Sequence, residues 1–183
     1  FGSHEALRQY AEHDFVSYYS DNSTAGFFGQ VWTHNAFLAA QSVAFGITLL
    51  WVPYLVVQNA LELGQSAAIM NEFGRLPDFF LYIAPHGQLE LYSLFTACAA
   101  GLMIGWSWIA PGPRTRAQSL ASAGRSLFTI VGGVVASLLV SGIIEGFVTR
   151  QPWPWAVKIG IGTAALAAFL VYQWVLGRRA VRA

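Results

Sequence analysis

Long apolar stretches, separated by short polar segments, dominate the sequence and leave few folds open to it. A helix that crosses the hydrocarbon core of a bilayer needs about 20 residues. About five stretches approach or exceed that length, at residues 36–54, 56–73, 79–109, 127–148 and 156–176. The second is marginal, and a re-entrant element is the alternative for it. We therefore predict an all-α fold, a polytopic bundle of about five transmembrane helices.

The composition agrees with this class of protein. The 183 residues are 55% hydrophobic and 10% charged, whereas soluble domains carry about 25% charged residues. A net charge of +1, without clusters of Lys and Arg, excludes nucleic acid as a partner. Cys98, the only cysteine, lies in an apolar run and excludes an internal disulfide.

Residues 1–33 are more polar than the rest and form a separate region, whereas residues 34–183 form the transmembrane domain. Within the first region we predict an amphipathic helix on or near the membrane surface. The apolar side would be Leu7, Ala11, Phe15 and Tyr18, and the charged side Glu5, Arg8, Glu12 and Asp14. Because the chain opens at Phe1 and not at Met, we expect a further segment upstream.

Arginine residues predict the orientation, because positively charged loops stay in the cytoplasm. They follow the third and the fifth stretch: Arg114, Arg116 and Arg125, and then Arg178, Arg179 and Arg182. Counting back through five spans places residues 1–33 outside and the C-terminus in the cytoplasm.

The tract Pro85-His86-Gly87-Gln88-Leu89-Glu90-Leu91 places ionisable side chains in an apolar stretch, where they survive mainly if protein or water surrounds them. Pro85 and Gly87 predict a break near the start of the third helix. His86 and Glu90 are four residues apart and share one helix face. With the predicted topology, a polar cluster forms near the outer face from His34, Asn35, His86, Glu90 and Glu145.

Three interpretations of this cluster stay open. It could be a hydrogen-bonded network that only fixes helix packing, a binding site for an ion or a partner, or a catalytic centre. No local signature of an activated nucleophile is present. No cofactor is expected, and the alternative is a divalent metal ion bound by His34, His86, Glu90 and Glu145.

Small residues recur every four positions on two predicted helices, and such faces let helix backbones approach closely. They are Ala97, Gly101 and Gly105 on the third helix, and Gly142 and Gly146 on the fourth. Close packing within the chain is the main interpretation, and a homodimer seam is the other. On the second helix, Asn59 would cap or stop the helix near the cytoplasmic face, and Glu62 would be solvated or face the bundle.

Several short motifs resemble the stage II sporulation protein M family, in the form found in actinobacteria-like genomes. The similarity runs from about Tyr18 to the end of the chain. It rests on Val31-Trp32-Thr33-His34-Asn35-Ala36, Gln58-Asn59-Ala60, the Pro85–Leu91 tract, Ala100-Gly101-Leu102 with Gly105-Trp106, and Ser141-Gly142-Ile143-Ile144-Glu145-Gly146-Phe147-Val148-Thr149. The departures are Ala60, Glu62 and Arg150, and none touches the His86 and Glu90 pair.

The resemblance implies a multi-pass protein of the bacterial cytoplasmic membrane that anchors a complex degrading the cell wall during engulfment of the forespore. Its partners carry the hydrolysis, so we expect a scaffold subunit that contacts other membrane or envelope proteins and is not itself an enzyme. The alternative is a metal-dependent intramembrane site that serves ion transport or hydrolysis of a membrane-associated substrate.

Overall fold

A computed structural model describes residues 3–20 and 24–182, and every described element is helical. The side chains of Arg179 and Arg182, used above for orientation, lie outside the described part. The elements are α1 (His4–Gln9), η1 (Tyr10–Asp14), α2 (Phe15–Ser20), α3 (Thr24–Ala44), η2 (Gly46–Thr48), α4 (Trp51–Glu72), α5 (Leu76–Ile109), α6 (Arg116–Ile143), η3 (Ile144–Thr149) and α7 (Trp155–Arg182). The all-α class is confirmed.

Within the described residues, three helices are long and apolar enough to cross a membrane: α5, the continuous helix formed by α6 and η3, and α7 up to Val175. Helices α3 and α4 have 21 and 22 residues, which is sufficient length, but they are not apolar enough to join this group. The chain is therefore a membrane protein, and three of the five predicted spans have the expected composition.

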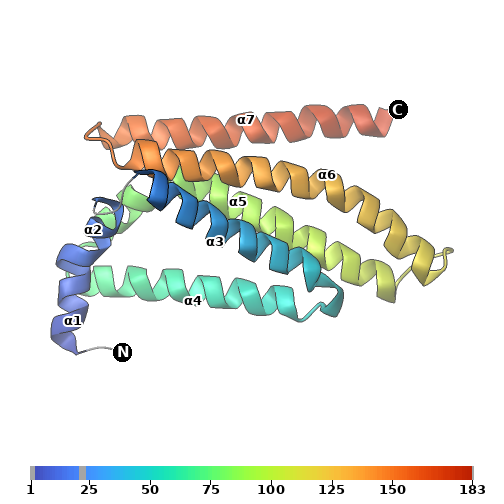
Figure 1. Cartoon of the computed structure of the whole chain (residues 1–183), viewed down its shortest axis with the longest axis horizontal. Coiled ribbons are helices and arrows are strands. Elements are labelled where there is room, and N and C mark those ends of the chain that lie inside the picture. Colours follow the sequence, from blue (N-terminus) through green and yellow to red (C-terminus); the bar gives the residue numbers. More distant parts are fainter. Residues whose placement is uncertain (1–2, 21–23, 183) are drawn as a thin grey trace.

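Helix α5 lies at the centre of the bundle and contacts each of the other long helices (Figure 1). Helices α6 and α7 pack on one side of it, and α3 and α4 pack on the other. This central position lets side chains of α5 meet residues from all parts of the chain.

The predicted break in the third helix is wrong, because α5 runs unbroken from Leu76 to Ile109 with Pro85 inside it. A proline in a helix removes one N–H donor and leaves the carbonyl four residues back, here that of Leu81, without its usual partner, and membrane helices tolerate such prolines. Here Ser141 of α6 donates a hydrogen bond to the carbonyl oxygen of His86, at 3.1 Å. The backbone of α7 at Gly162 comes directly against the carbonyl of Pro85. Two neighbouring helices thus pack closely on the backbone of the turn that contains Pro85.

The first predicted span, residues 36–54, is also wrong as a single helix. Helix α3 ends at Ala44, and the chain reverses through η2 and Leu49, whose φ is 58°, before α4 begins at Trp51. The turn sits tightly on α5, because a Cβ on Gly46 would overlap the backbone of Gly101. Apolar composition alone could not reveal this turn, since residues 45–50 include Phe45, Ile47, Leu49 and Leu50. Helix α3 also starts earlier than expected, at Thr24. The predicted boundary between the N-terminal region and the transmembrane domain, at residues 33 and 34, therefore lies inside this helix.

The N-terminal helical segment is amphipathic, as its sequence indicates, but its apolar side packs against the protein. Ala11, Phe15 and Tyr19 are buried against Val31, Met70 and Phe79 of helices α3 to α5. Tyr19 takes the buried place that the sequence assigned to Tyr18, which is half exposed. The cause is the π-helical turn η1, because a π turn holds an extra residue and shifts the following side chains around the axis.

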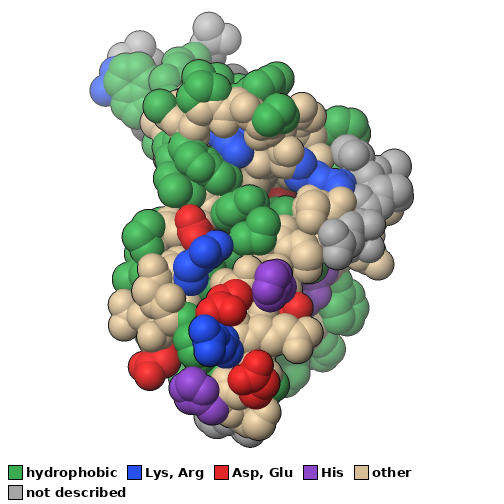
Figure 2. All heavy atoms as spheres, turned by 90° about the vertical axis from the view of Figure 1, so that its left-hand side faces the viewer, with side chains coloured by type: hydrophobic (Ala, Val, Ile, Leu, Met, Phe, Trp, Pro, Cys, Tyr) green, Lys and Arg blue, Asp and Glu red, His purple; other side chains and the backbone are tan. Residues whose placement is uncertain are grey.

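The end of the bundle that carries α1 and α2 is the more polar one. Viewed onto that end, acidic, basic and histidine side chains gather on the surface (Figure 2). Two ion pairs, Arg8–Glu12 and Arg75–Asp78, belong to it. These exposed charges are placed where water or lipid headgroups would solvate them.

Candidate functional site

A π-helical turn at the end of the fourth long helix builds one side of the site. In η3 the hydroxyl of Thr149 donates a hydrogen bond to the carbonyl of Ile144, five residues back, at 3.3 Å. π-helical turns often occur at functional sites. The turn presents Glu145 and Thr149 toward α5.

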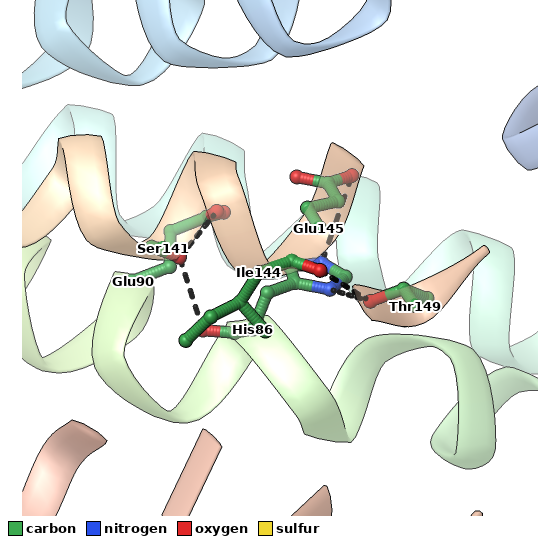
Figure 3. Close-up of polar contacts among 6 residues, drawn as sticks. All are labelled: His86, Glu90, Ser141, Ile144, Glu145 and Thr149. Atoms are coloured by element: carbon green, nitrogen blue, oxygen red, sulfur yellow. Dashed lines mark hydrogen bonds and ion pairs between the residues drawn. The ribbon is translucent and has the colours of Figure 1, made fainter. Parts of the chain in front are cut away.

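Three ionisable side chains meet there: His86 and Glu90 from α5, and Glu145 from η3 (Figure 3). One ligand atom of each lies within 4.8 Å of the other two. The distance between Nε2 of His86 and Oε1 of Glu145 is 3.7 Å. His86 and Glu145 are buried, with 5% and 4% of their surface exposed, whereas Glu90 is half-buried.

Hydroxyl groups of the fourth long helix hold this cluster from one side. The Oγ of Ser141 lies 3.1 Å from the carbonyl oxygen of His86 and 3.4 Å from Oε2 of Glu90, so its single proton is shared between two acceptors. The Oγ1 of Thr149 lies 3.5 Å from Nδ1 of His86. The amide of Asn35, on α3, also contacts the carboxyl group of Glu90.

One atom of the cluster has no such support. The Oε2 atom of Glu145 is buried and has no hydrogen-bond partner among the described residues. A buried carboxyl oxygen without a partner is costly, because it loses its hydration without compensation. A network that served only helix packing would be expected to give this oxygen a hydrogen-bond partner.

A large groove opens beside the cluster. Helices α3 and α4 meet at η2 and diverge from it (Figure 1). The groove, with a volume of about 1370 Å³, is lined by residues of these two helices together with α5 and α2. Tyr18 and Tyr19 line it at one end, and apolar side chains of α3, α4 and α5 line its walls. Its polar lining includes His34, Asn35, Asn59, Glu62, Glu90 and Glu145.

The groove explains where the other predicted site residues lie. His34 is exposed in the middle of α3 and lines the groove, but it is not part of the three-residue cluster. Asn59 and Glu62 line the opposite wall, and the amide of Asn59 donates to the carbonyl of Leu55 at 2.9 Å. Asn59 and Glu62 thus line the same groove as Glu90.

The small residues singled out in the sequence lie at helix contacts inside the chain. A Cβ on Gly101 would overlap the backbone of Ser42, and one on Gly105 would meet Gly46 and Leu49. Ala97 is buried in a cluster that joins α3, α5 and α6. A Cβ on Gly142 would come within 3.2 Å of Phe28, and Gly146 is buried in η3.

The family model for stage II sporulation protein M matches residues 2–150. The chain belongs to this family. No curated protein and no solved structure shows a significant match to it. The matched residues include all three members of the cluster and both walls of the groove, whereas α7 lies beyond them.

In this member of the stage II sporulation protein M family, sequence reasoning missed three residues of the site, two of which are hydroxyl residues beside Glu145. Ser141 and Thr149 flank Glu145 at intervals of four residues, so all three share one side of the helix. That spacing was visible in the sequence, but hydroxyl residues are common in membrane helices and do not by themselves indicate a site.

Tyr19 was the third residue missed. Its ring centroid lies 6.3 Å from that of His86, and it lines the groove. Burial raises the pKa of Tyr19 well above its ordinary value, and the nearby carboxyl group of Glu145 raises it further. Tyr19 therefore stays uncharged and lies beside His86 where the cluster borders the groove.

Lys158 of α7 supports the far end of η3. Its ammonium group donates hydrogen bonds to the carbonyl oxygens of Thr149 and Gln151, at 3.0 and 3.2 Å, and lies 3.2 Å from the ring centroid of Trp155. A cation at the C-terminal end of a helix is favourable, because the last carbonyl groups carry partial negative charge. Lys158 thus helps to hold Thr149 in place.

Proposed function

We propose that this chain is a scaffold subunit of the bacterial cytoplasmic membrane that holds a transmembrane helix of a partner envelope protein in the groove between α3 and α4. The role is not catalytic. The observation that carries the proposal is the groove itself, which is larger than the 300–1,000 Å³ typical of small-molecule pockets.

The walls of the groove favour a helix as its occupant. Phe37 of α3 and Phe95 of α5 are 63% and 55% exposed and line the groove, and Leu63 and Leu91 are more than one third exposed beside them. An amphipathic or transmembrane helix, about 10 Å wide, fits against such a row of side chains.

The composition of α3 and α4 also favours a protein partner over lipid. These two helices flank the groove, and they are the long helices that are not apolar enough to cross a membrane on their own. Glu62 and His34 face the groove, where hydrocarbon chains would leave them without hydrogen bonds. A partner helix would cover both.

The charge of the lining defines the chemistry of the partner. Glu62 lines the groove apart from the three-residue cluster, and none of the described lining residues is Lys or Arg. The complementary occupant is an apolar helix with one basic or hydrogen-bond-donating residue near its middle.

The proposed orientation places residues 1–33 outside and the C-terminus in the cytoplasm. Arg114, Arg116 and Arg125 lie in the loop and first turns after α5, in agreement with a cytoplasmic loop. Because α3 and α4 form an antiparallel pair, the orientation of α5 to α7 is the same whether or not that pair crosses the membrane. Single cysteines placed at Glu5 and at Arg116, in a Cys98→Ala background, test it by labelling intact cells with an impermeant thiol reagent. We expect the reagent to label Glu5→Cys and not Arg116→Cys. The opposite result would show that the protein has the reverse orientation.

Site-specific photocrosslinking in native membranes tests the scaffold role. A photoreactive residue replaces Phe37, and the control replaces Phe128, which is 84% exposed on α6 outside the groove. We expect the Phe37 probe to crosslink to a transmembrane helix with a basic residue, mapped by mass spectrometry, and Glu62→Gln to weaken that crosslink. The Phe128 probe should label lipid. Crosslinks only to lipid, or only to a second copy of this chain, would overturn the proposal.

A further inference from the structure

We infer that His86, Glu90 and Glu145 bind one divalent transition-metal ion, with Zn²⁺ as the expected species. This inference goes beyond the scaffold role and does not depend on it. It is carried by the convergence of the three side chains, by the hydrogen bond of His86 to Thr149, and by the unpartnered oxygen of Glu145.

The donor atoms have nearly the spacing of a metal shell. Zn²⁺ binds nitrogen and oxygen at about 2.0–2.2 Å, so two donors of a tetrahedral site lie about 3.4 Å apart. Nε2 of His86 and Oε1 of Glu145 are 3.7 Å apart, and all three donors lie within 4.8 Å of one another. A small closing movement of the Glu90 side chain would complete three ligands.

The contacts of Thr149 favour one tautomer of His86. Thr149 donates its proton to the carbonyl of Ile144, which leaves its Oγ1, 3.5 Å from Nδ1 of His86, available as an acceptor for the tautomer protonated on Nδ1. The proton then stays on Nδ1, and the lone pair of Nε2 points toward the carboxyl group of Glu145. Metal-binding histidines characteristically donate their second nitrogen to an oxygen in this way.

Two acceptors that face each other need a cation between them. Nε2 of His86 and Oε1 of Glu145 are too far apart for a direct hydrogen bond, and Oε2 of Glu145 has no partner among the described residues. A divalent ion would satisfy these atoms and would balance the two carboxylates, which lowers the cost of placing charge at membrane depth.

The ligand types indicate the class of metal. Ca²⁺ and Mg²⁺ prefer shells of oxygen only, whereas an imidazole with carboxylates suits zinc and its neighbours in the first transition row. Glu90 and Glu145 line the groove, which provides a path for the ion and room for water as a fourth ligand.

Metal analysis of the purified full-length chain in lipid nanodiscs tests the inference without any partner. After exposure to Zn²⁺ and removal of free metal, we expect about one zinc per chain and a higher Tm than for the metal-free protein. The content should fall to less than about one tenth in Glu145→Gln and His86→Ala, because even the loss of an outer partner of a ligand costs 10–100-fold. Glu62→Gln is the matched control, since it changes a carboxyl group of the same groove outside the cluster, and it should retain the zinc.

X-ray absorption of the zinc-loaded wild type keeps the test decisive if the variants fail to fold. We expect a first shell of nitrogen and oxygen with the scattering of a single imidazole. Sulfur in the shell, equal metal content in all variants, or neither retained metal nor a Tm shift with Zn²⁺, Mn²⁺ or Co²⁺ would each overturn the inference. The last result would mean that a proton, not a metal, joins His86 to Glu145.

Discussion

Nδ1 of His86 lies 3.5 Å from Oγ1 of Thr149, although the two residues are 63 positions apart and belong to different helices. The contact depends on the π turn η3, which directs Thr149 back toward Ile144 and leaves its oxygen free to accept from the imidazole. Thr149 is thus a positioning residue for His86.

Replacing Thr149 by valine, which keeps the shape and removes the hydroxyl, should weaken Zn²⁺ binding by about 10–100-fold. The physical reason is that His86 loses the partner that holds its ring and its tautomer. Titration against a competing chelator measures the affinity, and Thr149→Ser should restore it. Equal affinity of the valine variant and the wild type would show that Thr149 only packs.

Gly162→Ala should loosen the contact between α7 and α5. An added Cβ would overlap the carbonyl oxygen of Pro85, and overpacking of this kind costs about 1–3 kcal/mol. The free energy of unfolding in mixed detergent micelles measures the effect. Gly160→Ala is the matched control, because nothing lies within 4 Å of a Cβ there, and it should be neutral or stabilise by up to about 1 kcal/mol. Equal effects of the two changes would contradict the close contact between Gly162 and the carbonyl of Pro85.

The hydroxyl groups of Ser93 and Ser137 should be energetically coupled, since their oxygen atoms lie 2.7 Å apart in the buried contact between α5 and α6. Hydrogen bonds between membrane helices contribute on average about 0.6 kcal/mol and at most about 1.7. A double-mutant cycle with Ser93→Ala and Ser137→Ala measures this coupling in the unfolding free energy. Strict additivity would mean that each hydroxyl is satisfied by its own helix, through the carbonyls of Leu89 and Val134.

Phe15→Ala should release the N-terminal helix without unfolding the membrane helices. Phe15 is 7% exposed and contacts Phe79 and Tyr82 of α5, and such a truncation costs about 3–5 kcal/mol. Because Phe15 lies in the middle of the buried contact between this segment and α5, we expect faster proteolysis within residues 3–20 and an unchanged helical signal. Tyr18→Ala, at a half-exposed neighbouring position, is the control. Unchanged proteolysis of Phe15→Ala would contradict this view of the helix.

The membrane class, the helical fold and the His86 and Glu90 pair could be predicted from the sequence, because each depends on local patterns. A long apolar run must form a helix in a bilayer, where its backbone has no other hydrogen-bond partner. Residues four apart on that helix must share a face. For the same reason the amphipathic pattern of residues 7–15 indicated a helix, although not what would cover it.

The remaining features depend on contacts between distant segments. Ser141 and Gly162 contact the backbone of the turn that contains Pro85 from two other helices. The π turn η1 shifts Tyr19 to a position that a regular helical period does not give. The divergence of α3 from α4, which opens the groove, starts at a turn made of apolar residues. The sequence by itself determined that the chain forms long apolar helices and that His86 and Glu90 share one helix face. Only the tertiary structure decided that Glu145 and Thr149 meet His86, because the packing of helices around α5 sets those distances.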